Sequence, residues 1–211
     1  EALERTLTEI VRRHEVLRTT FRSVDGEAVQ VIGEAQPLRI PLTELSELEA
    51  ARELIHAEAQ APFDLSTGPL LRVRLLRLGA EEHIVVLTMH HIVSDAWSMG
   101  LLLNEISTLY RAYTAGEASP LMELPIQYAD YAVWQREWLQ GEVLEAELGY
   151  WREQLGGELP VLELPTDRVR PAVQSYRGRQ LAFRLSKDLS QSLHELSRSH
   201  GCTLFMTLLA A

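Results

Sequence analysis

The sequence predicts an α+β fold in which a mixed sheet is flanked by helices. Apolar residues recur at helical spacing in several segments, they alternate with polar residues in others, and an Asp-Gly pair joins two of the alternating segments. A chain of 211 residues with this pattern is typical of a layered protein with one main domain and the start of a second.

The first part of the chain is predicted to contain helices and a hairpin. Asp25-Gly26 tolerates the positive φ angles of a two-residue hairpin turn. Ser46 signals the start of the second helix, which must end before Pro62. The predicted elements are a helix over 1–14, strands over 17–24 and 28–32, an extended segment over 38–42 and a helix over 48–59.

The middle of the chain alternates between short apolar segments and longer helical ones. Arg72 and Arg74 alternate with apolar residues, as in a half-buried strand, and glycines mark the helix ends. The predicted elements are strands over 71–75 and 83–91 and helices over 98–113, 128–139 and 142–155.

A stretch without periodicity separates these elements from the C-terminal ones. Pro160, Pro165 and Pro171 punctuate it, which indicates a linker. A strand over 180–185, a helix from the Ser186 cap to His200 and a new helix near Thr203 are predicted to follow. Both ends of the chain look cut, so we expect a fragment of a longer protein.

The charge of the chain disfavours anionic partners. With 20 basic and 30 acidic residues the net charge is −10, which would repel nucleic acid and an anionic membrane surface. No apolar run approaches the roughly 18 residues of a spanning helix, and no secretory signal is present at the start, so we expect a cytoplasmic location. Cys202 is the only cysteine and cannot form an internal disulfide.

The run from Met89 to Ser98, Met-His-His-Ile-Val-Ser-Asp-Ala-Trp-Ser, is the candidate site. Adjacent residues of a strand face opposite sides, so one of His90 and His91 is expected to be buried support and the other to face a cleft. No metal site is expected, because the next histidine on the parity of His91, His83, lies roughly 26 Å back along an extended strand.

Ser94 and Cys202 are possible nucleophiles, but neither lies in a nucleophile elbow. A histidine acting alone as a general base needs no covalent enzyme intermediate. Asp95 is better placed to hold the loop through an ion pair with an arginine than to act as a second base.

Three blocks of the sequence resemble the condensation domains of nonribosomal peptide synthetases, which are relatives of chloramphenicol acetyltransferase. Arg12 to Phe21 is similar to the family's Arg-His-Glu-x-Leu-Arg-Thr-x-Phe motif, and Met89 to Ser98 to its His-His-x-x-x-Asp-Gly motif. Tyr128 to Arg136 is similar to the Tyr-x-Asp-Tyr-Ala-x-Trp-Gln block, although taken alone this segment predicts an amphipathic helix with core aromatics.

The resemblance implies peptide-bond formation between a donor acyl thioester and an acceptor amine. Both would be tethered by phosphopantetheine arms to peptidyl carrier domains upstream and downstream, beside an adenylation domain in the same synthetase; the domain itself would bind no cofactor. His91 would deprotonate or position the amine and stabilise the tetrahedral intermediate, with His90 as support. Asp95 would be a structural acid paired with Arg18.

One residue departs from the family pattern. Ala96 stands where glycine is usual, and its methyl group would narrow the donor tunnel at the loop that also carries Trp97. The paired histidines argue against the cyclising relatives. The run from Ser94 to Gly100 resembles the branch that joins an L-configured donor to an L acceptor.

The resemblance also implies a domain division. Residues 1–159 would be the N-terminal lobe without its first strand and helix, 160–179 the interlobe linker, and 180–211 the start of a truncated C-terminal lobe. Because the family's active site lies between the lobes, the first lobe alone would have little or no activity.

Two other functions fit the same residues. A coenzyme A-dependent acyltransferase would need a basic patch for phosphates, for which Arg72, Arg74 and Arg77 are the candidates, although a solvated face explains them better. A non-catalytic recruitment or carrier-docking domain would keep the fold, but such relatives tend to lose the motif histidine, which is present here as His91.

Overall fold

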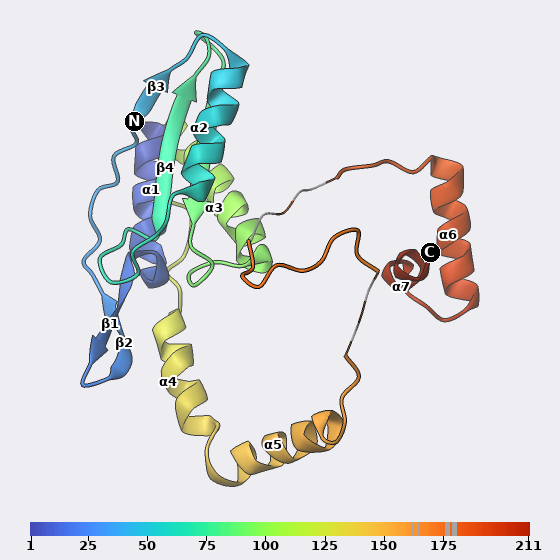
Figure 1. The fold of residues 1–211 in the computed structure, drawn as a ribbon. Helices are drawn as coiled ribbons and strands as arrows, with labels where there is room; N and C mark the ends of the chain where they lie inside the picture. Colours follow the sequence, from blue (N-terminus) through green and yellow to red (C-terminus); the bar gives the residue numbers. More distant parts are fainter. Residues whose placement is uncertain (162, 164, 176–177, 179–180) are drawn as a thin grey trace. The chain divides into compact units, whose positions relative to one another are not determined.

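The computed structural model describes residues 1–161, 163, 165–175, 178 and 181–211. Contacts divide the chain into two compact units, Glu1–Gly157 and Glu158–Ala211. Helices and a mixed sheet occur together in the first unit, which confirms the predicted α+β class (Figure 1).

The N-terminal helix leads into a hairpin. Helix α1 covers Ala2–Arg13, and the short 3₁₀ helix η1 covers Glu15–Arg18. Strands β1 (Thr19–Val24) and β2 (Glu27–Ile32) pair antiparallel around Asp25 and Gly26, whose φ angles are 52° and 86°, as the predicted turn requires. The strand predicted over 17–24 begins later because η1 takes up its first two residues.

A separate three-stranded sheet carries the candidate motif. Strand β3 (Leu42–Glu44) runs parallel to β4 (Leu71–Arg77), which pairs antiparallel with β5 (His83–Met89). The extended segment predicted over 38–42 was therefore placed too early, since only Leu42 of it pairs in the sheet. The strand predicted over 83–91 is shorter, because the chain turns immediately after Met89.

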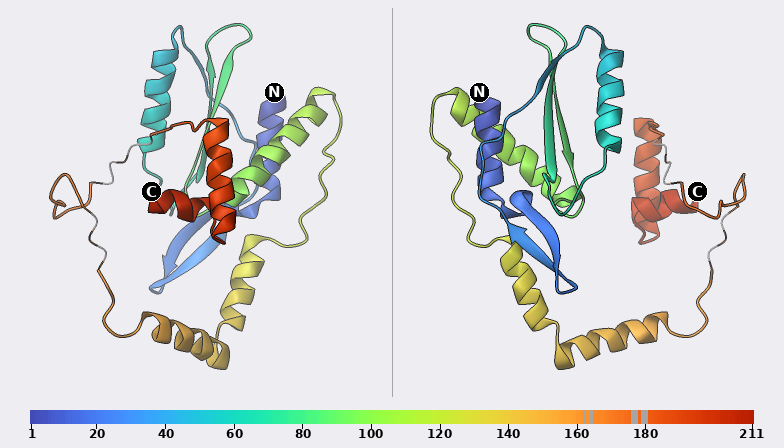
Figure 2. Two further views of the ribbon diagram at one scale, coloured as in Figure 1. Left: turned by 90° about the vertical axis from the view of Figure 1, so that its right-hand side faces the viewer. Right: turned by 60° about the vertical axis from the view of Figure 1, so that its left-hand side comes forward.

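Helices cover both faces of this sheet (Figures 1 and 2). Helices α1 and α3 (Ala96–Thr114) lie on one face, where Leu71 and Val73 of β4 join their core. Helix α2 (Leu48–Gln60) lies on the other, where Leu76 and Val86 pack against Ala51. The two-residue alternation of strand side chains thus builds three layers.

Two helix starts differ from the predictions. Glu47 rather than Ser46 is the N-cap of α2, and it makes no side-chain capping bond. Helix α3 begins at Ala96, two residues before the predicted start, because Asp95 caps it.

Helices α4 (Tyr128–Trp138) and α5 (Gly141–Leu155) extend away from the layered core (Figure 1). Gln127 ties the start of α4 to the end of α1, because its side-chain amide donates to the carbonyl of Arg13 and accepts from the amide of Glu15. The prediction of core aromatics is wrong for this helix, in which no residue is buried. Four half-exposed rings instead contact one another in series along one face: Tyr128, Tyr131, Trp134 and Trp138.

The second unit contains two helices in its described residues. Helix α6 (Lys187–Ser199) begins at the predicted Ser186 cap, whose hydroxyl accepts from the amide of Leu189, and α7 (Leu204–Ala210) is capped by Thr203. The strand predicted over 180–185 is not formed at 181–185, where the described residues pair with no other strand. Gln180 and linker residues 162, 164, 176, 177 and 179 lie outside the described residues.

Across the described part of the chain, no helix has both the length and the apolar character needed to cross a membrane.

Candidate active site

The two motif histidines lie in the turn that joins β5 to α3. The amide of His90 still donates to the carbonyl of Leu70, but its own carbonyl accepts from Val93, so the chain reverses there. His90 is half-buried: its ring packs edge-on against Phe63, with centroids 5.7 Å apart, and its Nδ1 accepts from the amide of Ile92 at 3.0 Å. These contacts stabilise the turn, as expected of a supporting residue.

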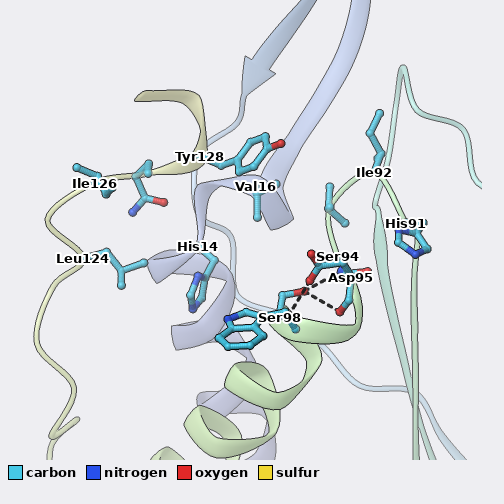
Figure 3. A pocket seen from close by; sticks show the side chains of 13 residues that line it. His14, Val16, His91, Ile92, Ser94, Asp95, Ser98, Leu124, Ile126 and Tyr128 are labelled. Carbon is cyan, nitrogen blue, oxygen red and sulfur yellow. Dashed lines mark hydrogen bonds between the residues drawn. The ribbon is translucent and has the colours of Figure 1, made fainter. Parts of the chain in front are cut away.

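His91 is exposed and lines a cavity of about 460 Å³. Its imidazole makes no hydrogen bond within the described part of the chain. Figure 3 shows His91 and His14 on opposite sides of this cavity, with Ser94 and Asp95 between them. One histidine thus packs inward and the other faces the cavity, although both follow the strand rather than belong to it.

The cavity is built from three regions of the sequence. The other lining residues come from η1, from the β5–α3 turn with the start of α3, and from the segment before α4: Val16, Ile92, Val93, Trp97, Ser98, Leu124, Ile126, Gln127 and Tyr128. The first, second and third sequence blocks therefore meet at one place, with His91 at its edge.

Asp95 holds the start of α3 rather than an arginine. Its Oδ1 accepts from the amide of Ser98 at 2.7 Å, and the Ser98 hydroxyl accepts from the amide of Asp95 at 2.8 Å, which makes a reciprocal capping box (Figure 3). The Ser98 hydrogen bonds, with a smaller contribution from nearby His91, lower the pKa of the Asp95 carboxyl.

The predicted ion pair between Asp95 and Arg18 is not formed in this structure. Arg18 donates instead to the carbonyl of Gly33 and to Glu15 Oε1, the latter at 3.2 Å. The reason is local: capping bonds occupy Asp95 within its own turn, whereas Arg18 sits on η1 beside the end of the hairpin.

We expect Asp95→Ala to lower the stability of the domain, because it removes the N-cap of α3, whereas Asp95→Asn keeps a capping oxygen and stays close to wild type. Urea unfolding midpoints and the rate of product formation, measured together on both variants, test this. An Asp95→Asn variant that is fully stable but inactive would contradict a purely structural role.

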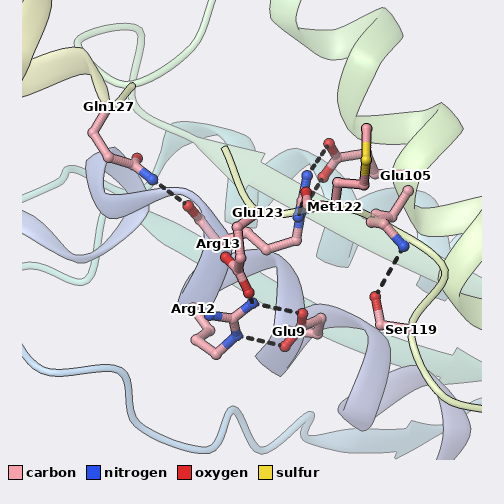
Figure 4. Close-up of polar contacts among 9 residues, drawn as sticks. Glu9, Arg12, Arg13, Glu105, Ser119, Met122, Glu123 and Gln127 are labelled. Atoms are coloured by element: carbon pink, nitrogen blue, oxygen red, sulfur yellow. Dashed lines mark hydrogen bonds and ion pairs between the residues drawn. The ribbon is translucent and has the colours of Figure 1, made fainter. Parts of the chain in front are cut away.

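A charged cluster that the sequence analysis did not single out faces the same cavity. His14 Nε2 lies 2.8 Å from Glu105 Oε2, and the guanidinium of Arg13, whose side chain is 4% exposed, contacts both Glu105 oxygens. Arg13 also donates to the carbonyl of Met122 (Figure 4). Burial disfavours ionisation of Glu105, but the hydrogen bonds from Arg13 and His14 outweigh it and lower the pKa of this carboxyl.

The first block contained a signal for this cluster. Arg13 and His14 close an amphipathic helix, where basic residues are common, and a buried carboxylate is the partner such a buried arginine requires. That partner is 92 positions away from Arg13 on α3, so sequence spacing could not identify it.

The two donor-loop residues differ in their surroundings. Trp97 lines the cavity and is 82% exposed. Ala96 is the first residue of α3, where a helical φ suits alanine, and it does not line the cavity. The narrowing expected from its methyl group is therefore not seen in this lobe.

The other candidate residues have structural partners. Arg72 and Arg74 both bind Glu58 at 2.6 Å, and Arg77 binds Glu44 at 3.2 Å. The Ser94 hydroxyl donates to the carbonyl of His90 at 3.3 Å rather than to a base. No group of three or more metal-ligating side chains occurs among the residues that the structure describes.

Comparisons with known proteins agree with this geometry. Residues 1–211 match the family described as the condensation domain. The chain is 52% identical over its whole length to a linear gramicidin synthase from Brevibacillus parabrevis, of which it spans 3%. It is 47% identical over its whole length to the chondramide synthase cmdD from Chondromyces crocatus, of which it spans 6%.

Solved structures show the same similarity. The X-domain from teicoplanin biosynthesis superposes with a TM-score of 0.83 and 32% identity over 96% of this chain and 46% of that one. The condensation domain from the Monacolin K polyketide synthase MokA has a TM-score of 0.78 and 25% identity over 96% of this chain and 48% of that one. The chain thus spans less than half of either solved chain.

Proposed function

Because this chain belongs to the condensation domain family, we propose that the domain containing it forms a peptide bond between an acyl or peptidyl thioester donor and an aminoacyl acceptor. Both substrates are carried on phosphopantetheine arms of carrier proteins. The resemblance of residues 94–100 favours an L-configured donor and acceptor.

The chemistry needs a neutral amine held against a thioester. The acceptor nitrogen attacks the donor carbonyl carbon, the tetrahedral intermediate collapses, the carbon–sulfur bond breaks, and the departing thiolate takes up the proton that the amine loses. A single imidazole beside the amine suffices to position or deprotonate it. We assign this role to His91.

The observation that carries this proposal is the placement of His91. Its ring is exposed at the edge of the 460 Å³ cavity, unlike that of His90, which is packed against Phe63 and bonded within the turn. A ring sealed among apolar side chains could not reach a carrier-bound substrate.

The division of the chain supports a lobe organisation. We assign residues 1–159 to the N-terminal lobe, 160–179 to the linker and 180–211 to the start of the C-terminal lobe, on the strength of a contact boundary between Gly157 and Glu158. The partners are then the upstream and downstream carrier domains and the adenylation domain of the same synthetase.

The test uses the domain completed to the length of its solved relatives, with a donor-loaded and an acceptor-loaded carrier protein. We expect an amide-linked product on the acceptor carrier, detected by mass spectrometry of the intact carrier. Acetyl-coenzyme A in place of the donor carrier should give no product, because carboxylates or neighbouring carbonyls already occupy Arg72, Arg74 and Arg77.

Two outcomes would contradict the proposal. Product from acetyl-coenzyme A alone would favour the coenzyme A-dependent acyltransferase. Carrier binding without any product would favour the recruitment domain.

A further inference from the structure

A second, smaller cavity adjoins the one that His91 lines. Its volume is about 140 Å³, close to the engineered apolar cavity of about 150 Å³ known to bind benzene. The two cavities share a set of lining residues: His14, Val16, Val93, Ser94 and Ser98. A group entering the small cavity would therefore belong to a molecule that also occupies the larger one.

The walls of the small cavity are apolar and lie on regular elements. Leu17 comes from η1, Met89 from the end of β5, and Leu101 and Leu102 from α3. Leu17 and Leu102 are buried in the main core, so the floor of the cavity is fixed by packing. A site on rigid elements selects its occupant by shape and size.

The polar groups at its rim already have partners. The Ser94 hydroxyl donates to the carbonyl of His90, the Ser98 hydroxyl bonds within the Asp95 capping box, and His14 Nε2 is held by Glu105. A polar or charged side chain entering the cavity would lose water without regaining these hydrogen bonds, whereas an apolar one would gain by burial.

We propose that this cavity is a specificity pocket for an apolar side chain of the aminoacyl or acyl substrate that reacts beside His91. This inference rests on the proposed function and adds the substrate class. An aliphatic or single-ring side chain of the size of leucine or phenylalanine fits the volume, and a glycyl group leaves it empty.

The test fills the pocket from its most accessible wall. Leu101 is 57% exposed, so Leu101→Trp places bulk at the mouth without opening the core. Leu103→Trp is the matched control, because Leu103 is 53% exposed on the same helix and does not line the pocket. Val16→Phe repeats the test from the wall made by η1.

The readout is the ratio of kcat/KM for a leucyl or phenylalanyl substrate to that for a glycyl substrate, in the complete domain with loaded carrier proteins. One arm varies the donor with a glycyl acceptor, and the other varies the acceptor with a fixed donor. We expect Leu101→Trp and Val16→Phe to lower the ratio by about tenfold or more in one arm, which identifies the substrate, while Leu103→Trp leaves it unchanged.

Three results separate success from failure. A ratio unchanged in both arms overturns the pocket while product formation still supports the proposed function. An equal loss in Leu103→Trp also overturns it, since the effect would not depend on the cavity. No product from the wild-type domain refutes the proposed function, and the pocket assignment falls with it.

Discussion

Replacing His91 by alanine should reduce peptide-bond formation by about 10²- to 10⁴-fold in the complete domain, the usual contribution of a positioned acid–base group. The exposed imidazole at the edge of the cavity is the group assigned to the acceptor amine, and it makes no hydrogen bond in the described part of the chain that would give it a structural role. The fold should therefore be retained. Single-turnover formation of product on the acceptor carrier measures the loss.

The matched control is His83→Ala. His83 is an exposed histidine at the other end of β5 and lines none of the cavities described above, so its loss should leave the rate unchanged. Circular dichroism and the urea midpoint establish that both variants fold. Near wild-type turnover by His91→Ala would reject the role assigned to this residue.

Replacing Glu105 by alanine should cost about 3–5 kcal/mol of folding free energy, because it leaves the guanidinium of Arg13 buried without its counter-charge. A domain has a total stability of only about 5–15 kcal/mol, so this loss is severe. Urea unfolding followed by far-UV circular dichroism measures it in the complete domain.

Two variants separate the buried charge from general effects of mutation. Glu49→Ala removes an exposed partner of Arg52, at 71% and 67% exposure, and should change stability by less than about 1 kcal/mol. A double variant, Arg13→Met with Glu105→Leu, removes both charges and should recover part of the loss. If the double variant were as unstable as Glu105→Ala, packing rather than the unpaired charge would be the cause.

The same pair predicts a pH dependence. Hydrogen bonds hold the pKa of Glu105 below its ordinary value of 4.5, so the stability it contributes is present above that pH and is lost as the pH falls through the lower, folded-state value. Glu105→Gln should accordingly show a smaller loss of stability in this acid range than the wild type.

Local sequence patterns were sufficient for most elements. Asp25-Gly26 specified the hairpin because few residues tolerate two consecutive positive φ angles, and Ser186 and Thr203 specified helix starts through their own side chains. The errors lie where a local pattern competes with a neighbour. Leu17 and Arg18 have strand-like character but form the 3₁₀ turn, and Ser46 yields the N-cap position to Glu47.

By itself, the sequence determined which residues could carry the chemistry. The order of the three blocks pointed to the condensation family, and the paired histidines pointed to His91 as the reacting group and His90 as its support. Such conclusions need only residue identity and spacing along a few adjacent positions.

Only the tertiary structure decided which distant groups meet. It paired Arg13 and His14 with Glu105, kept Asp95 as a helix cap away from Arg18, and placed an apolar cavity between η1, β5 and α3. The physical reason is that burial creates these partnerships: a charge or a methyl group has a strong preference for a neighbour only once water is removed, and folding decides where that happens.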